Sequence, residues 1–158
     1  MSGTEIVGLV AQLFTVVALI LALMQLIGAR AAKHRDFENL YVERYWNLMD
    51  SFRGDPWAAP SRLKLPKEDR AKIIFYLQLC EDELDLRRNG FISTKTWDLW
   101  ATGMISQCAR PAYADSIRFL PSDELPALRY FLQTRKDPLK MSVIRKWWTG
   151  IGFKGPKR

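Results

Sequence analysis

The chain has 158 residues, is 48% hydrophobic and carries a formal net charge of +7 at pH 7. The apolar fraction and 19 aromatic residues (Trp 6, Tyr 5, Phe 8) suffice for a folded core, and one histidine with two separated cysteines excludes a convincing zinc site. The positive charge is local, because residues 129–158 hold nine Lys or Arg and one Asp, while the other 128 residues hold 15 basic and 16 acidic residues.

An uncharged, apolar stretch occupies residues 6–29, between Glu5 and Arg30. A hydrocarbon core of about 30 Å needs roughly 20 helical residues, so this stretch predicts one transmembrane helix after a short extracytoplasmic head, residues 1–5. Small side chains at helical spacing, with one amide beside them, predict a face for contact with a second helix in the membrane. These residues are Gly8, Ala11, Gln12, Thr15, Ala18 and Ala22.

A cleaved secretory signal peptide is the alternative interpretation, because residues 29–31 resemble a cleavage site. We favour an anchor, since the start MSGTE lacks a positive region and the apolar run is too long for a signal peptide. Basic residues that flank a span stay in the cytoplasm, and Arg30, Lys33 and Arg35 follow this one. The prediction is a single-pass protein of the inner (cytoplasmic) membrane, with the N-terminus outside and residues 30–158 inside.

Beyond the span, residues 36–53 show helical spacing of apolar side chains and end before Gly54. Few helix breakers precede them, so this helix can continue directly out of the membrane. Residues 54–65 contain two prolines and are predicted to form a loop. The next helix, residues 66–89, begins at a proline, ends at Gly90 and has apolar residues on two faces, so we expect it at the domain centre.

Further helices are expected along the rest of the chain. Ser93 is expected to cap a helix over about 94–108, and residues 111–119 to form a short helix that begins at a proline. Ser122, followed by two acidic residues, is expected to start another helix that has Pro126 in its first turn.

No segment shows the alternation of a strand. The predicted fold is therefore all-α, with the transmembrane helix followed by a small four- or five-helix cytoplasmic domain over 30–138. A basic, tryptophan-containing C-terminal segment, 139–158, follows it. In the reducing cytoplasm Cys80 and Cys108 are expected to stay as thiols packed on apolar helix faces.

Residues 85–96, DLRRNGFISTKT, have the outline of a calcium-binding helix–loop–helix. However, Arg87 stands at the third loop position and Thr96 replaces the bidentate glutamate at the twelfth. We therefore interpret the stretch as structural, with an Asn-Gly turn that ends one helix, Ile92 packed inside and Ser93 capping the next helix.

Four acidic residues lie close together in the helix 66–89. Because they are nearly consecutive, they fan around the helix and predict a solvated acidic face balanced partly by Arg87 and Arg88, or a surface for a basic partner. They are Glu81, Asp82, Glu83 and Asp85. The sequence contains no phosphate-binding glycine loop and no nucleophile motif, so we predict neither an enzyme nor a cofactor or metal.

The C-terminal segment combines basic residues with tryptophans, which favour an anionic leaflet and its headgroup zone. It predicts docking on membrane lipids or on a partner protein, rather than nucleic-acid binding; a solvated tail whose tryptophans close the core is the alternative. The docking residues are Arg145, Lys146, Trp147, Trp148 and Lys154.

The pieces ERYWNLMDSF, YLQLCEDELDLRRNGFIS and TWDLWATGM form a pattern of an acid-rich helix, an Asn-Gly turn and a Trp-x-x-Trp helix. This pattern resembles uncharacterised bacterial single-pass membrane proteins that have a small helical cytoplasmic domain of unknown function. The resemblance implies no chemistry and no catalytic residue.

Together these features predict a non-enzymatic, membrane-anchored interaction protein. We expect it to be an accessory or structural subunit of a larger membrane protein complex, or to self-associate through its span. The alternative is a single-pass signalling or phage-defence component whose cytoplasmic domain senses a ligand or partner.

Overall fold

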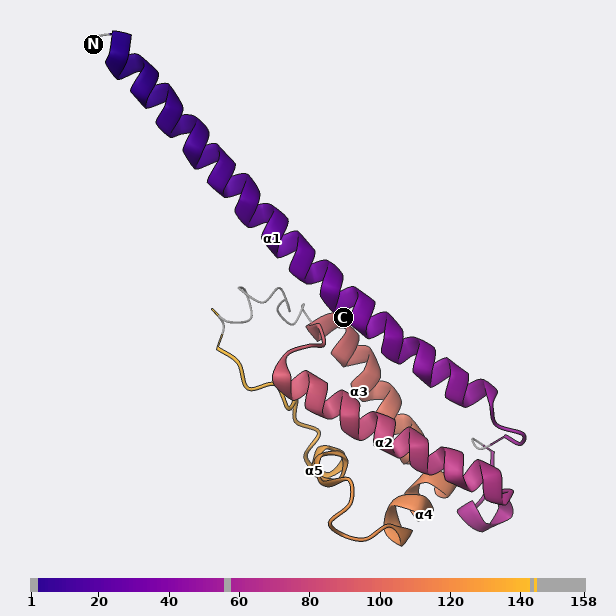
Figure 1. Ribbon diagram of the computed structural model, residues 1–158. Helices are drawn as coiled ribbons and strands as arrows, with labels where there is room; N and C mark the ends of the chain where they lie inside the picture. The colour runs from indigo at the N-terminus through magenta and orange to yellow at the C-terminus, as the bar shows by residue number, and fades with distance from the viewer. Residues whose placement is uncertain (1–2, 56–57, 143, 145–158) are drawn as a thin grey trace.

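The structure, a computed structural model, describes residues 3–55, 58–142 and 144, without the side chains of residues 3–5, 9, 27, 30, 31 and 33. Every regular element in this part of the chain is helical, which confirms the all-α prediction. The elements are α1 (Gly3–Asp50), the 3₁₀ turn η1 (Arg62–Lys64), α2 (Lys67–Asn89), α3 (Thr94–Cys108), α4 (Pro111–Phe119) and α5 (Pro126–Thr134). In Figure 1 the first half of α1 projects away as a rod, and the other helices gather beside its second half.

Helix α1 is a single helix of 48 residues. At about 1.5 Å per residue it is about 70 Å long. The expected continuation of the apolar stretch into the next helix is confirmed, because α1 has no break between them. Its two halves differ, since the apolar side chains described in its first half are exposed, whereas Tyr41 is buried and Tyr45, Leu48 and Met49 pack against the core.

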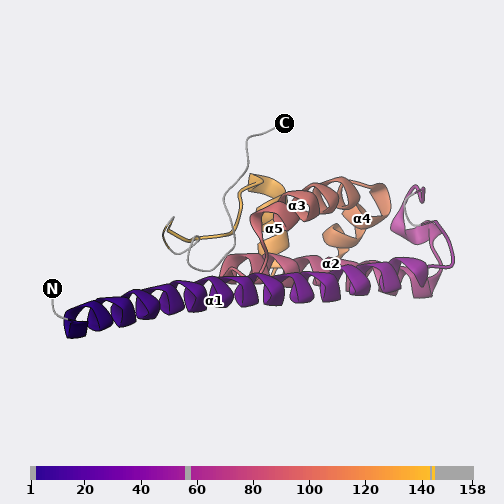
Figure 2. The ribbon, with the colours of Figure 1, turned by 90° about the horizontal axis from the view of Figure 1, so that it is seen from above.

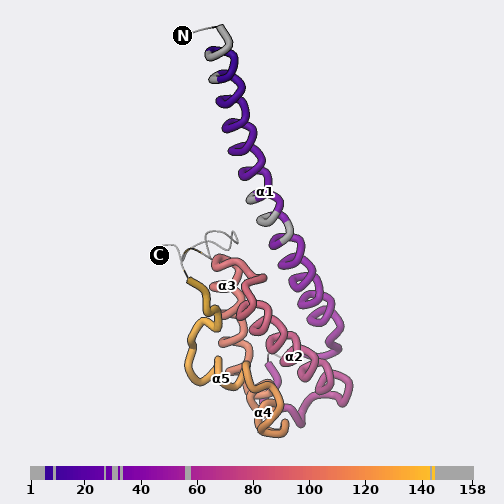
Figure 3. Tube along the Cα trace, turned by 60° about the vertical axis from the view of Figure 1, so that its left-hand side comes forward, coloured from indigo at the N-terminus to yellow at the C-terminus, as the bar shows by residue number. Residues whose placement is uncertain are grey.

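Helix α2 lies at the centre of the domain, as expected, and contacts α1, α4 and α5. Figures 2 and 3 show α1 alongside α2, with α4 and α5 on the side of the domain away from α1. One predicted apolar face of α2 is buried throughout: Ile73, Leu77, Cys80 and Leu84. The second apolar face is covered at Leu79, but Phe75 is 60% exposed, so this face is covered only in part.

The remaining helices pack aromatic rings against α2 and each other. The Trp97 ring of α3 lies 5.3 Å from the Phe131 ring of α5, and the Tyr76 ring of α2 lies 5.3 Å from the Tyr113 ring of α4, measured between ring centroids. Cys80 and Cys108 are buried free thiols in this core, which confirms their predicted packing.

The turn between α2 and α3 follows the sequence prediction. Gly90 ends α2 in the left-handed conformation (φ 80°), which glycine adopts without steric cost. Ile92 is fully buried, and the Ser93 hydroxyl accepts a hydrogen bond from the Thr96 amide at 3.3 Å, capping α3.

The predicted start of the last helix at Ser122 is wrong, because α5 begins at Pro126. A residue before proline is disfavoured in the α conformation, and Leu125 instead has a φ of 57°. The cap comes from another helix: the Glu81 carboxylate of α2 accepts hydrogen bonds from the amides of Ala127 at 2.9 Å and Leu128 at 2.7 Å. A cap supplied across the domain leaves no local signal in the sequence.

Candidate functional site

A groove of about 220 Å³ lies between α1 and α3, with α2 contributing to its lining. We call it the aromatic groove, after five rings and one carboxyl group that line it: Tyr41, Tyr45, Trp46, Tyr76, Trp100 and Glu83. Drug-sized ligands occupy sites of about 300–1,000 Å³, so this groove has room only for a smaller group.

Helix α1 lines the groove with two pairs of residues at a spacing of four, which places both pairs on adjacent rows of one helix face. The pairs are Tyr41 with Tyr45, and Val42 with Trp46. Tyr41 and Tyr45 also hold α1 to the domain, since the Tyr41 ring lies 6.3 Å from Trp100 and the Tyr45 ring 6.2 Å from Tyr76. Trp46 remains 55% exposed and contacts the Tyr45 ring edge-on at 5.2 Å.

Helix α3 forms the opposite wall, with Leu99, Trp100, Gly103, Met104 and Gln107. A side chain at Gly103 would meet no atom within 4 Å, so the missing side chain leaves free space in this wall. The Gln107 amide connects this wall to two other helices, because its Oε1 accepts from the Tyr45 hydroxyl of α1 at 3.4 Å and its Nε2 donates to the Tyr113 hydroxyl of α4 at 2.9 Å.

Helix α2 contributes Tyr76 and Glu83, which lie two turns apart. Glu83 is only 7% exposed, and none of the ion pairs or hydrogen bonds found among the described residues involves its carboxyl group. Burial, and to a lesser extent the nearby negative charge of Asp82, raise the pKa of Glu83 to about 8. This carboxyl group is therefore mostly neutral at pH 7 and would gain from a positive charge placed beside it.

Burial also raises the pKa of the tyrosines that line the groove, Tyr41, Tyr45 and Tyr76, so all three keep their hydroxyl protons near neutral pH. The guanidinium of Arg44 lies 5.0 Å from the centroid of the Tyr41 ring, which shows that a cation already rests on one of these aromatic residues.

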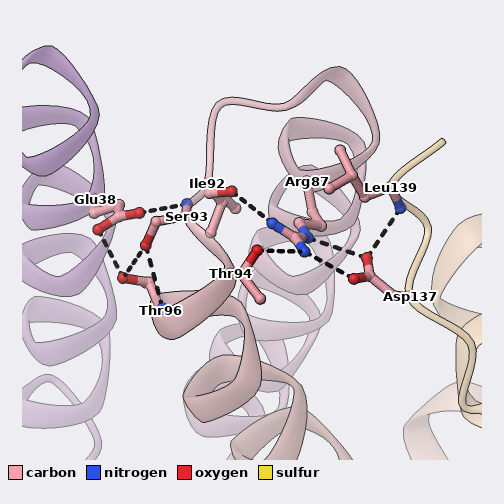
Figure 4. A network of polar contacts seen from close by, with 8 residues as sticks. All are labelled: Glu38, Arg87, Ile92, Ser93, Thr94, Thr96, Asp137 and Leu139. Atoms are coloured by element: carbon pink, nitrogen blue, oxygen red, sulfur yellow. Dashed lines mark hydrogen bonds and ion pairs between the residues drawn. The ribbon is translucent and has the colours of Figure 1, made fainter. Parts of the chain in front are cut away.

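A second polar cluster surrounds the turn between α2 and α3. It connects α1, α2, α3 and the segment after α5 (Figure 4). Arg87 is fully buried, and its guanidinium donates to both Asp137 oxygens, at 3.0 and 2.7 Å. It also donates to the Ile92 carbonyl at 2.8 Å. The guanidinium thus lies among the oxygens of the calcium-like loop, which agrees with the structural interpretation of that loop.

On the side of α1, the Glu38 carboxylate accepts hydrogen bonds from the Ser93 amide at 2.6 Å and the Thr96 hydroxyl at 2.7 Å (Figure 4). Next to it, His34 Nδ1 lies 2.9 Å from the Phe91 carbonyl oxygen. Because a carbonyl only accepts, Nδ1 carries the proton. These contacts attach the α2–α3 turn to α1 within a few residues of the apolar stretch.

The prediction of a solvated acidic face on α2 is partly wrong. Asp82 and Asp85 are exposed, and Asp85 pairs with Arg88 at 3.2 Å, as expected. Glu81 instead caps α5, Glu83 is buried in the aromatic groove, and Arg87 is buried against Asp137. Glu81 and Arg87 bind residues that are distant in the sequence, and Glu83 lines a groove formed by three helices. Neighbouring residues in the sequence do not indicate these contacts.

The residues predicted for helix contact in the membrane all lie in the exposed first half of α1: Gly8, Ala11, Gln12, Thr15, Ala18 and Ala22. The Thr15 hydroxyl donates to the Ala11 carbonyl at 2.9 Å, so it is satisfied within the helix. The predicted docking residues Arg145, Lys146, Trp147, Trp148 and Lys154 lie outside the described residues.

Sequence reasoning missed the aromatic groove. The apolar spacing of residues 36–53 indicated only a packed helix face, and Glu83 was placed among solvated acids. One signal was present: Glu83 lies three, four and seven residues from Cys80, Leu79 and Tyr76, which puts a carboxyl group on an apolar helix face.

Comparison of the chain with protein-family models, curated proteins and solved structures finds no match. Among the described residues, no group of three or more His, Cys, Asp or Glu side chains is placed to hold a metal ion. The candidate site therefore rests on the geometry of the aromatic groove.

Proposed function

We propose that this chain is a non-enzymatic, single-pass membrane protein whose helical domain binds a partner at the cytoplasmic surface of the inner membrane. Its role would be that of an accessory subunit of a membrane protein complex, or of a protein that self-associates through its span. The observation that carries the proposal is the first half of α1, where Ile6–Leu26 has a mean hydropathy of 2.7 and is 0% buried.

Water is a poor solvent for this surface, because each exposed leucine or phenylalanine side chain leaves about 1.5–3 kcal/mol of burial energy unused. Lipid would supply that burial, and a helix satisfies its own backbone hydrogen bonds there. The 21 residues of Ile6–Leu26 span about 32 Å, close to the thickness of a hydrocarbon core.

The unbroken course of α1 suggests how the domain would sit at the membrane. Glu38 and His34 bind the α2–α3 turn to α1 shortly after the apolar stretch, so anchor and domain would behave as one rigid unit. In the orientation favoured by the flanking basic residues, the half-exposed Phe91 ring, 5.9 Å from Phe37, would lie at the end of the domain nearest the inner leaflet.

Contact with another membrane helix would use the small side chains along α1 from Gly8 to Ala22. The basic segment that contains Trp147 and Trp148 would add contacts with anionic lipid or with the same partner.

The anchor is tested by Val16→Arg, which places a charge at the middle of Ile6–Leu26. An arginine at the centre of a span costs about 2.5–3.5 kcal/mol of insertion energy, so we expect a large loss of protein from the carbonate-washed membrane fraction. Asn47→Arg, on the exposed part of the second half of α1, is the matched control and should leave membrane association unchanged. Full retention of the Val16→Arg protein in the carbonate-washed membrane fraction would contradict the anchor.

The partner is tested by native mass spectrometry after mild detergent extraction. Co-purification with a defined complex supports the accessory role, and a homo-oligomer that dissociates when Ala18 is changed to leucine supports self-association. A lone monomer would contradict both.

The aromatic groove favours a second candidate function. A signalling or phage-defence component that senses a ligand needs a preformed site, and the groove combines five rings with a buried carboxyl group that lacks a partner among the described residues.

A further inference from the structure

We propose that the aromatic groove binds a small organic cation, an ammonium group that carries methyl or other short alkyl substituents. Glu83 would be its counter-ion, and the tyrosine and tryptophan rings would surround its apolar substituents. This inference goes beyond the proposed function, because it assigns a ligand class to a site that the membrane anchor does not require.

The composition of the lining selects for an alkylated cation. Aromatic rings attract cations through their negative faces, and rings of tyrosine and tryptophan around one site are a known means of recognising quaternary ammonium groups. Arg44 beside the Tyr41 ring shows this attraction within the molecule itself. A strongly hydrated inorganic cation would lose more on leaving water, because the groove offers it one carboxyl group and few other oxygen atoms.

The position of Glu83 explains why the groove would prefer a positively charged ligand. Glu83 as a residue is only 7% exposed, but its carboxyl group has no ion-pair partner among the described residues. Leaving a buried charge unpaired is costly, whereas a ligand that brings the opposite charge removes that cost. A neutral ligand of the same shape would gain only the apolar contacts.

The size of the groove limits the part of a ligand that it can enclose. Its volume of about 220 Å³ suits an ammonium group with a few carbon atoms and is too small to enclose a whole nucleotide or peptide segment. Trp46 and Leu99, which are 55% and 70% exposed, stand at the rim and could cover a bound ligand without a change in the backbone.

The same chemistry could come from a free metabolite or from a lipid headgroup, and the geometry favours the free molecule. Tyr41 lies 15 residues along α1 from Leu26, which corresponds to about 22 Å at 1.5 Å per residue. Headgroup layers extend only about 5–8 Å beyond the hydrocarbon core. This step rests on the proposed anchor; the ligand chemistry does not.

Binding should release a proton, since the ligand prefers the ionised form of Glu83. The ionisable groups that interact with it are Tyr41 and Tyr45 on α1, and Tyr76, Cys80 and Asp82 on α2, while Arg44 lies against the Tyr41 ring. The lining residues of α3 carry no ionisable side chain. With a pKa of about 8 for Glu83, affinity should rise about tenfold per pH unit from pH 6 to 7 and level off above pH 8.

The test is a calorimetric titration of the full chain, held in a maltoside detergent, with choline and with its neutral carbon isostere, 3,3-dimethylbutan-1-ol. We expect choline to bind about tenfold or more tightly than the isostere, with the pH dependence given above. Glu83→Gln should reduce the preference for choline and remove its pH dependence, whereas the matched control Asp82→Asn, one residue away and exposed, should keep both.

Trp46→Leu removes an exposed ring and should weaken choline binding about fivefold without affecting the fold. Equal binding of choline and the isostere, no detectable choline binding at pH 8, or unchanged binding by Glu83→Gln would overturn the proposal. Circular dichroism of each variant verifies its folding.

A second arm distinguishes the source of the cation. The titration is repeated in nanodiscs of phosphatidylcholine and of phosphatidylglycerol. Equal affinity for choline in both supports a soluble ligand, whereas loss of binding in phosphatidylcholine alone overturns that assignment in favour of the headgroup.

Discussion

The two halves of α1 belong to one helix but depend on different properties of their residues. In the first half the described side chains of Ile6–Leu26 are all exposed, and the Thr15 hydroxyl bonds within the helix. In the second half, Glu38, Tyr41 and Tyr45 each contact a particular atom or ring of another helix. The first half of α1 therefore requires only that its side chains be apolar, whereas the contacts of the second half depend on the identity of single residues.

The same contrast extends through the domain, where buried or half-buried polar side chains connect the helices. Glu38 holds α1 to α3, Glu81 caps α5, and Arg87 binds the segment after α5. Asp69 accepts hydrogen bonds from the amides of Arg53 and Gly54 and so ties the turn after α1 to α2. Substitutions at such positions should have large effects, and substitutions in the exposed half of α1 should have small effects on the domain.

The largest effect is expected for Asp137→Ala. It leaves the fully buried Arg87 guanidinium without its bidentate partner, which typically costs about 3–5 kcal/mol. The measurement is denaturant unfolding in detergent, followed by tryptophan fluorescence. Asp85→Ala is the control, because its ion pair with Arg88 is exposed and should contribute less than about 1 kcal/mol. Similar losses for both variants would break the contrast between buried and exposed polar groups.

The next largest effect is the pH dependence of the free energy of unfolding. The pKa of Glu83 is about 8 in the folded chain and 4.5 in its ordinary state, so the folded chain binds more protons between these values. The free energy of unfolding should therefore fall by about 1.4 kcal/mol per pH unit from pH 5.5 to 7.5, and level off above pH 8. Glu83→Gln should remove this slope and be the more stable protein at pH 8. Parallel pH profiles for the two proteins would show that Glu83 is ionised in the fold.

A smaller effect is expected for Glu38→Ala, which removes two charge-assisted hydrogen bonds between α1 and α3. We expect a loss of about 1.5–3 kcal/mol and faster amide exchange in residues 34–50 than in α2. Glu43→Ala, an exposed residue on the same helix, is the control. Unchanged exchange in 34–50 would mean that the rings alone attach the second half of α1.

The smallest effect is expected for Ala18→Leu in the first half of α1. The residue is exposed and makes no contact with the domain, so the unfolding free energy of the domain should change by less than about 0.5 kcal/mol. A larger change would show that the two halves are coupled more strongly than their contacts indicate.

The course of the main chain was largely predictable from the sequence. The apolar stretch, the Asn-Gly turn, the Ser93 cap and the prolines at residues 66 and 111 act through neighbours in the sequence, and the helices begin and end close to these signals. The clear failure is α5, where the expected cap at Ser122 was replaced by Glu81 from a helix more than forty residues earlier.

The aromatic groove was decided by tertiary structure. Tyr41, Glu83 and Trp100 lie on three helices, and the sequence shows only that each is on a helix face, not that the faces meet. The physical reason is the distance along the chain between the interacting residues. Helix start and end signals act between neighbours in the sequence, and hydropathy is a sum over consecutive residues. A buried carboxyl group, a cap from another helix and an aromatic lining instead depend on which helices pack together.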